Sequence, residues 1–358
     1  MFLESLSITN FKNHAEANFS FREKLNGFCG HNGVGKTNIL DSIYYLCSGK
    51  SHFIATDAET VRHGHNFFRI SGSFLSGENI KYNISVQVEP GKSKEIFVNG
   101  KKIKSIAAHV GTVPVIFQAP DDIYRLLDLS AERRKWIDRA IAQQDKEYLE
   151  NLLFYHKLLK QRNAFLKSEP QANNTSLLDW YDQKMAPVAA KISDKRHLYM
   201  KEVNEFFQSI YESISSGSEK VFVDYIPILS PDEWLSIFRA SQKIDMVAQR
   251  TTVGIQRDDI IFTMDEKPLK RVGSQGQVKS YILSLILSQF LATKQLHNKV
   301  PILLLDDIFA RLDHQRVSNL LKFLHSEKTG SIFITDTDGD RVKKVMVEAH
   351  HSFDIFQL

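Results

Sequence analysis

One stretch of the sequence decides the fold class: Gly30-His31-Asn32-Gly33-Val34-Gly35-Lys36-Thr37. It fits the pattern G-x-x-x-x-G-K-S/T at every fixed position, follows the apolar segment 25–29 and leads into a helical run, 38–46. In such a loop the glycines let backbone N–H groups surround phosphate oxygens, and the start of the following helix adds positive charge. The sequence therefore predicts the phosphate loop of a nucleotide site rather than an ordinary glycine-rich turn.

The residues of this loop have separate predicted tasks. Lys36 is expected to bridge the β- and γ-phosphates, and the hydroxyl of Thr37 is expected to be a ligand of Mg²⁺. The predicted nucleotide-binding residues of the loop are Gly30, His31, Asn32, Gly33, Val34, Gly35, Lys36, Thr37 and Asn38.

A second part of the site is predicted at the end of an apolar strand. Ile302-Leu303-Leu304-Leu305 is followed by two carboxylates, Asp306 and Asp307. A buried strand in this position holds a metal-linked Asp beside the phosphates. We expect Asp306 to bind Mg²⁺, directly or through water, and Asp307 to act as general base or to orient the attacking water. An Asp pair alone could instead cap the next helix, but the phosphate loop favours the metal site.

The segment Val272-Gly273-Ser274-Gln275-Gly276-Gln277 opens a predicted helix before Asp306. It resembles the signature motif of ABC-type ATPases, in which a Ser hydroxyl and a helix start cap the γ-phosphate held by a second subunit. The predicted contact residues are Ser274, Gly276 and Gln277. The same residues also fit a simple capping box between Ser274 and Gln277. The order of the three motifs along the chain favours the signature.

The patterns along the chain predict an α/β protein with a discontinuous main lobe. Residues 1–118 are rich in strands, and after residue 251 strands alternate with helices, which indicates a parallel sheet with crossover helices. Between them, 119–250 has long helical periodicity and few glycines. We therefore expect an ATPase domain formed by 1–118 and 251–358, with 119–250 inserted as a helical arm. A loop is expected at 168–176.

Composition leaves the function open. The 358 residues carry a formal net charge of +4, which permits nucleic-acid binding without requiring it. Cys29 and Cys47 fit no disulfide framework and are expected to be buried thiols in a reducing cytosol. No apolar run reaches the roughly 18 to 20 residues of a membrane span. The sequence therefore predicts a soluble cytoplasmic protein with no membrane partner.

The chain as a whole resembles the bacterial RecF family of recombination mediators. The motifs that carry the resemblance occur in RecF order and span nearly the whole chain: Ile8-Thr9-Asn10-Phe11-Lys12-Asn13, Gly35-Lys36-Thr37-Asn38, Phe117-Gln118-Ala119-Pro120-Asp121-Asp122, Ser130-Ala131-Glu132-Arg133-Arg134-Lys135-Trp136-Ile137-Asp138, Val253-Gly254-Ile255-Gln256-Arg257-Asp258-Asp259, Ser274-Gln275-Gly276-Gln277 and Leu303-Leu304-Leu305-Asp306-Asp307.

This resemblance implies an ABC/Rad50-like P-loop ATPase head, with a mixed sheet, an antiparallel β subdomain and a short helical arm. It implies ATP and Mg²⁺ as cofactors, ATP-dependent homodimers and slow, DNA-stimulated hydrolysis that serves as a switch. It also implies sequence-independent binding to double-stranded DNA and gapped junctions, cooperation with RecR and RecO in loading recombinase, and roles in DNA repair, replication and the SOS response.

The resemblance also assigns tasks to single residues. Gln118 matches the Q-loop residue that senses Mg²⁺ and γ-phosphate, Lys12 and Asn13 match a segment near the base and α-phosphate, and Asp313 matches the D-loop Asp that crosses the dimer seam. Thr335 stands where other ABC ATPases often keep a switch His. Two departures are Ala310-Arg311 in place of Ser-Glu in the D-loop, and Asp307 in place of Glu, which predicts slow turnover.

The predicted arm is not a basic domain, since 119–250 contains 19 Lys and Arg against 20 Asp and Glu. Two local clusters could contact DNA phosphates or could be solvated helix faces: Lys157, Lys160, Arg162 and Lys167, and Lys191, Lys195 and Arg196. The resemblance places the DNA surface mainly on the ATPase dimer. Arg133, Arg134 and Lys135 could pair with Glu132 and Asp138 or face the dimer seam, and the sequence does not decide between these.

Other P-loop proteins are weaker matches. The ATPase subunit of a membrane transporter usually has a shorter insertion between Q-loop and signature, and a switch His. A small-molecule kinase would have a phosphate loop without a signature motif and would need acceptor-site residues, so the motif at Ser274 opposes this alternative. A long SMC-type protein would need sustained heptads, which 119–250 lacks.

Overall fold

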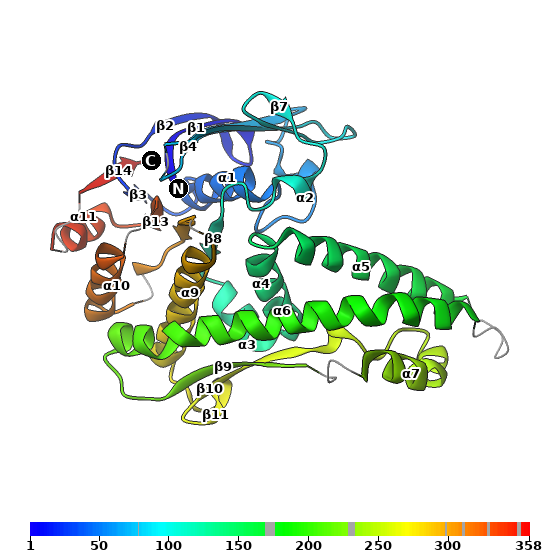
Figure 1. Ribbon diagram of the computed structural model, residues 1–358. Coiled ribbons are helices and arrows are strands. Elements are labelled where there is room, and N and C mark those ends of the chain that lie inside the picture. Colours follow the sequence, from blue (N-terminus) through cyan, green and yellow to red (C-terminus); the bar gives the residue numbers. More distant parts are fainter. Residues whose placement is uncertain are drawn as a thin grey trace. The chain divides into compact units, whose positions relative to one another are not determined.

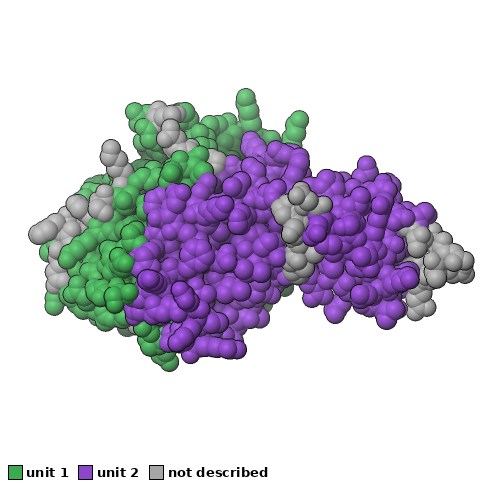
Figure 2. Space-filling model, turned by 60° about the horizontal axis from the view of Figure 1, so that its bottom comes forward, with its two compact units in different colours: residues 1–123, 209–218, 274–358 green, residues 124–208, 219–273 purple. Residues whose placement is uncertain are grey.

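A computed structural model describes residues 1–77, 79–168, 176–227, 233–297, 299–309, 312–327, 330–348 and 352–358. The chain forms two compact units, which Figure 2 colours separately. Unit 1 comprises residues 1–123, 209–218 and 274–358, and unit 2 comprises residues 124–208 and 219–273. The predicted domain bounds differ from this division, because 251–273 packs with unit 2 and 209–218 with unit 1. Most of the loop predicted at 168–176 lies outside the described residues.

Unit 1 contains a five-stranded parallel sheet, as the alternation of strands and helices predicts. Its strands, in spatial order, are β14 (Phe353–Gln357), β3 (Leu25–Cys29), β13 (Ile332–Asp336), β12 (Ile302–Leu305) and β8 (Val115–Gln118). Every neighbouring pair in this order is parallel. The strands β3, β13, β12 and β8 are buried along their whole length, as expected for a parallel sheet that is covered on both faces.

The second sheet of unit 1 has six strands, and every neighbouring pair of strands is antiparallel. Its order is β2 (His14–Ser20), β1 (Phe2–Phe11), β4 (Phe68–Leu75), β5 (Lys81–Val88), β6 (Glu95–Val98) and β7 (Lys101–Lys102). Buried and accessible residues alternate along β5, so one face is apolar. This face shares a hydrophobic core with helix α1 (Lys36–Ser48) and the parallel sheet. In Figure 1, α1 lies beneath the six-stranded sheet.

Four further helices lie wholly in unit 1: α2 (Ile106–His109), α9 (Gln275–His297), α10 (His314–Ser326) and α11 (Gly339–Glu348). The sequence predicts α9 and α10 but not α11 or β14. The strand β14 is only partly buried, and its pairing with β3 joins segments from the two ends of the chain, so local sequence gives little signal for it.

Unit 2 is mainly helical but also contains a small sheet. Its helices are α3 (Asp122–Asp128), α4 (Ser130–Ala142), α5 (Lys146–Lys167), α6 (Ser176–Ser215), α7 (Trp234–Ala248) and α8 (Leu269–Val272), with the ends of α3 and α6 in unit 1. Its antiparallel sheet has the order β11 (Lys267–Pro268), β10 (Asp259–Met264) and β9 (Val221–Ile226). The predicted helical arm therefore contains a strand, β9, that pairs with residues after 250.

The helices of the described ranges include none whose length and mean hydropathy together would suit a membrane crossing.

Candidate functional site

The carboxyl ends of β3, β12 and β13 lie at one edge of the parallel sheet, where ligands usually bind in open α/β sheets. A cavity of about 270 Å³ lies there. It is lined by Asn32, Gly33, Gly35, Lys36, Thr37, Asn38, Pro120, Asp306, Asp307 and Thr335. The structure therefore brings the predicted phosphate loop and the predicted Asp pair together around one space.

The backbone of the phosphate loop requires glycine at the start of α1. Gly35 is the N-cap of α1 and has a φ of 105°, a left-handed conformation. A Cβ atom there would lie 2.5 Å from the Nδ2 atom of Asn13 and from the Nε2 atom of His14. Asn13 also donates to the carbonyl of Val34 and accepts from Asn38, at 3.2 and 2.7 Å. These side chains, from the turn between β1 and β2 and from the start of β2, hold the loop in place.

Lys36 is buried and folds back onto its own loop. Its ammonium group donates to the carbonyls of Gly30 and His31, at 2.7 and 2.9 Å. No carboxylate pairs with it among the described residues. Carbonyl dipoles stabilise an ammonium less well than a charged partner does. An anion in the cavity would therefore gain a strong interaction with Lys36.

Three hydroxyl and carboxylate groups form a connected group opposite the loop. The Thr37 hydroxyl lies 3.0 and 2.9 Å from the two carboxylate oxygens of Asp306. The Thr335 hydroxyl donates to Asp306 at 2.6 Å and accepts from the backbone N–H of Asp307 at 2.8 Å. The Thr335 hydroxyl therefore forms hydrogen bonds with both Asp306 and Asp307. Thr335 occupies the position that the sequence analysis compares with the switch His of other ABC ATPases. These hard oxygen atoms are the ligand type that Mg²⁺ prefers.

The Asp pair has unusual electrostatics and backbone geometry. Burial raises the pKa of Asp306, against the opposing effect of the hydrogen bonds from Thr335 and Thr37. A cation beside this carboxylate would lower that pKa again. Asp307 has a φ of 50°, a left-handed conformation that is uncommon outside glycine and is often found at functional sites.

Gln118 ends β8 directly beside the Asp pair. Its carbonyl accepts from the N–H of Asp306 at 2.9 Å, and its side-chain Nε2 donates to the carbonyl of Ala119 at 2.8 Å. Its side-chain Oε1 is buried, and no described residue donates to it. An unsatisfied buried oxygen is rare. Gln118 is not among the described residues that line the cavity, so its contact with a ligand stays a prediction.

Lys12, by contrast, already has a partner. Its ammonium lies 2.6 Å from a carboxylate oxygen of Asp41 in α1, and both side chains are largely buried. Lys12 also lies over the ring of Phe53 at 5.1 Å. Lys12 is not among the residues that line the cavity. The contact expected between Lys12 and a nucleotide stays a prediction.

The signature segment forms the capping box that the sequence allows. Ser274 N donates to the Gln277 side chain at 2.8 Å, and Gln277 N donates to the Ser274 hydroxyl at 3.3 Å. Ser274 is exposed, and none of the predicted signature residues is among the described residues lining the cavity. A cap does not exclude a contact with a second copy, so that role stays a prediction.

The predicted D-loop is only partly described. Asp313 is the N-cap of α10 and accepts from the N–H of Arg316 at 2.9 Å. Ala310-Arg311, the departure noted above, lies outside the described residues.

Each basic cluster of the predicted arm has one member in a buried ion pair, whereas Lys157, Lys160 and Lys167 of the first cluster are exposed. Arg162 is fully buried and pairs with Asp182 and Asp245. Arg196 is buried against Asp138 and Asp258. The remaining members of the second cluster are also paired, Lys191 with Glu147 and Lys195 with Asp145. Helical spacing alone could not reveal these partners, which come from distant segments.

Arg133 has a partner that the sequence analysis does not name, and a position at a dimer seam stays a prediction. Arg133 donates from Nε and Nη2 to the Asp259 carboxylate, at 2.8 and 2.9 Å, within unit 2. Arg134 donates to the carbonyl of Asp258 at 2.7 Å, and Lys135 pairs with Glu132, which also pairs with Arg125. Through these hydrogen bonds, the motif 130–138 links α4 to the start of β10.

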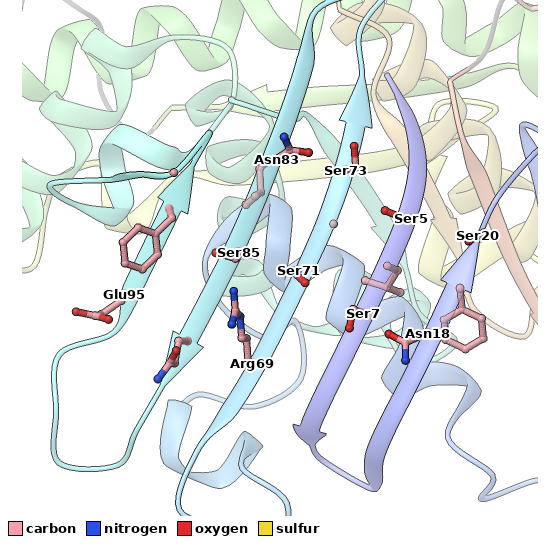
Figure 3. Close-up of a pocket in the computed structure, with 17 residues that line it drawn as sticks. Ser5, Ser7, Asn18, Ser20, Arg69, Ser71, Ser73, Asn83, Ser85 and Glu95 are labelled. Carbon is pink, nitrogen blue, oxygen red and sulfur yellow. The ribbon is translucent and has the colours of Figure 1, made fainter.

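A larger hollow, of about 770 Å³, lies on the outer face of the six-stranded sheet. Figure 3 shows Ser5, Ser7, Ser71, Ser73 and Ser85 along it. Arg69 and Glu95 are the charged residues among its described lining, so it is close to neutral. The backbone N–H groups of these strands pair within the sheet, so the hollow lacks the phosphate-binding groups of the smaller cavity.

The parallel sheet, the phosphate loop before α1 and the acids after β12 define an ABC-like ATPase head. The sequence matches the family described as the RecF/RecN/SMC N terminal domain over residues 2–356. The DNA replication and repair protein RecF of Phocaeicola vulgatus is 36% identical over 357 residues, 99% of this chain and 96% of the relative. The RecF protein of Flavobacterium johnsoniae is 34% identical over 360 residues, and the match covers 100% of this chain and 100% of the relative. This chain belongs to the RecF family.

Solved structures agree with this assignment. The structure of the recombination mediator protein RecF-ATPrS in the RecFOR pathway has a TM-score of 0.88 and 26% identity, and the match covers 100% of this chain and 96% of that one. An SmcHead bound to the C-winged helix domain of ScpA has a TM-score of 0.56 at 16% identity, over 98% of this chain and 92% of that one, and shows the fold alone. The family decides against the transporter and kinase alternatives.

Proposed function

We propose that this protein is an ATP-dependent DNA-binding protein of recombinational repair and replication-fork maintenance, in which ATP holds two copies together on DNA. The names of its relatives and of the RecF-ATP structure support this proposal. The observation that carries it is the single cavity in which the buried cation of Lys36 faces Thr37 and Asp306.

The cavity fits a nucleoside triphosphate with Mg²⁺. Lys36 would exchange two carbonyl partners for phosphate oxygens, and the N–H groups at the start of α1 would bind the same phosphates. Thr37 and Asp306 would hold Mg²⁺, with Gln118 as a further ligand. The metal would supply positive charge beside the phosphates.

Asp307 is the proposed water-orienting residue for slow hydrolysis. Thr335 holds its backbone N–H and the Asp306 carboxylate together, so the two acids keep a fixed relation. Asp is one methylene shorter than Glu, which places the carboxylate farther from the phosphates. This supports a switch that resets the protein rather than a rapid motor.

The second half of each site would come from another copy. Ser274, at the start of α9, would cap the γ-phosphate, and Asp313 would cross the seam. Closing the dimer would also join the DNA-contacting surfaces of the two heads. Contacts to phosphates would give sequence-independent binding to duplexes and gapped junctions that weakens steeply with salt. The RecFOR pathway named for the similar structures supports RecO and RecR as partners.

The test measures duplex binding by fluorescence anisotropy and dimer formation by mass, with ATP, ADP or no nucleotide. Wild type should bind DNA and dimerise only with ATP and Mg²⁺. Lys36→Ala and Ser274→Ala should both lose this response, but only Lys36→Ala should weaken nucleotide binding by the monomer. Equal DNA binding without nucleotide, by a protein that stays monomeric at saturating ATP, would refute the proposal.

A further inference from the structure

Arg316 lies in the first turn of α10 and is tied to the residue that caps this helix. Its backbone N–H donates to Asp313 at 2.9 Å, and its guanidinium also forms an ion pair with the same carboxylate. The hydrogen bond from the backbone N–H of Arg316, with a further effect of its charge, lowers the pKa of Asp313. Arg316 and Asp313 therefore form one local unit at the start of α10.

The guanidinium of Arg316 also lies against the signature segment. A Cβ atom built on Gly276 would be 3.2 Å from Nη1 and 3.4 Å from Nη2 of Arg316, so the planar group covers this glycine. Its Nε atom is shielded from solvent, and no described residue accepts a hydrogen bond from it. Arg316 thus connects the first turn of α9, which Ser274 directly precedes, with the first turn of α10, which Asp313 caps.

This connection concentrates positive charge. The starts of α9 and α10 are the positive ends of two helix dipoles, and Arg316 lies between them. Asp313 is the carboxylate that the described residues place against it. The arrangement would be stabilised by an anion, and the proposed function brings the triphosphate of a second copy to Ser274.

We infer that Arg316 is a positioning residue of the ATP-dependent dimer: it fixes the start of α9 to the start of α10, so that Ser274 and Asp313 meet the second copy as one rigid element. The inference rests on the proposed function. A Lys would keep the charge but could not cover Gly276 with a planar group while also pairing with Asp313.

The first experiment measures ATP-dependent dimerisation of full-length variants by mass, beside nucleotide binding by the monomer. Arg316→Ala should weaken dimerisation by roughly tenfold or more, the loss expected for a hydrogen bond to a charged group, with ATP binding by the monomer unchanged. Arg316→Lys should restore part of the loss. Lys322→Ala removes an exposed cation from the same helix and should behave as wild type.

Gly276→Ala tests the same contact from the other side, because its Cβ would lie 3.2 Å from Nη1 and shift the guanidinium by a few tenths of an ångström while leaving every charge in place. It should weaken dimerisation, by less than Arg316→Ala does, and it replaces Arg316→Ala as the test if that variant does not fold. Wild-type dimerisation by Arg316→Ala, or by Gly276→Ala in that case, overturns the inference. If wild type itself does not dimerise with ATP, the proposed function fails instead.

A mixing experiment distinguishes whether Arg316 supports the nucleotide bound by its own chain or the nucleotide bound by the second copy. In a mixed dimer of Arg316→Ala and Lys36→Ala, the intact phosphate loop of the first meets the intact α9 and α10 of the second. ATP-dependent dimers should reappear in this mixture, as in a mixture of Ser274→Ala with Lys36→Ala. Recovery in the Ser274 mixture alone would mean that Arg316 serves its own nucleotide, which contradicts the inference. If neither mixture regains ATP-dependent dimers, the inference is judged by the dimerisation of the single variants alone.

Discussion

Charged side chains are buried in both compact units, but they are neutralised in different ways. In unit 2, Arg162 has carboxylate partners in Asp182 and Asp245, at 3.0 and 2.6 Å. In the cavity of unit 1, the ammonium of Lys36 has carbonyl partners and the carboxylate of Asp306 has hydroxyl partners, and no described residue forms an ion pair with either. The buried cation of unit 2 has two carboxylate counter-ions, although its Nη2 atom has no hydrogen-bond partner among the described residues, whereas the charges of the cavity leave room for a ligand that would neutralise them.

The difference shows that burial of a charge does not by itself indicate a functional site. A buried ion pair that is fully hydrogen-bonded mainly specifies the packing of its segments. A buried charge without a counter-ion has a free-energy cost that hydrogen bonds offset in part and that a ligand of opposite charge would offset further. Lys36 and Asp306 are of the second kind, and their predicted roles rest on this incomplete neutralisation as well as on their motifs.

The largest expected effect concerns the chemistry in the cavity. Asp307→Asn should lower the rate constant of ATP hydrolysis by about 10²- to 10⁴-fold, the usual contribution of a general base. Nucleotide affinity should stay close to that of wild type, since Asp307 is not a predicted phosphate ligand. Steady-state hydrolysis and equilibrium nucleotide binding, measured on the same preparation, separate the two effects. A rate within twofold of wild type would remove Asp307 from the mechanism.

The buried pairs of unit 2 should respond in stability instead. Arg162→Met leaves Asp182 and Asp245 buried without their cation, so the free energy of unfolding should fall by about 3 to 5 kcal/mol. Lys160→Met removes an exposed cation from the same helix and should change it by less than about 0.5 kcal/mol. Chemical denaturation measures both variants. Equal stability of the two would contradict the assignment of Arg162 to a structural network.

The smallest effect is predicted for the stability of the nucleotide-free protein. Because burial raises the pKa of Asp306, its charged form destabilises the nucleotide-free protein at neutral pH. Asp306→Asn should therefore leave the free energy of unfolding unchanged or raise it at pH 7, while Mg²⁺-dependent nucleotide binding is lost. As the pH falls through the raised pKa, wild type gains a proton and the difference in stability should disappear. A loss of stability that persists at low pH would contradict this account.

Much of the site could be predicted from the sequence because its motifs are local. The phosphate loop, the strand before Asp306 and the cap at Ser274 each lie within a few residues, and the structure places the first two around one cavity. The parallel sheet followed from the alternation of strands and helices. The conformation of Asp307 and the link through Thr335 required the folded sheet, because β12 and β13 are separate segments.

Other features depended on contacts between distant segments. Arg162 and Arg196 carry the same local signal as surface cations, and only their packing against Asp182, Asp245, Asp138 and Asp258 distinguishes them. The strand β9 was hidden in a helical region because its partner, β10, follows much later in the chain. Arg316 gave no signal because its contact with Gly276 joins two helices.

Equilibrium binding of ATP in the presence of Mg²⁺, measured by calorimetry on wild type and Lys36→Met, tests the central claim most directly. The incompletely neutralised cavity predicts that wild type binds one nucleotide per chain and that Lys36→Met, with the same fold by circular dichroism, loses most of this affinity. Equal affinities of the two proteins, or no binding by wild type, would contradict the assignment of the cavity.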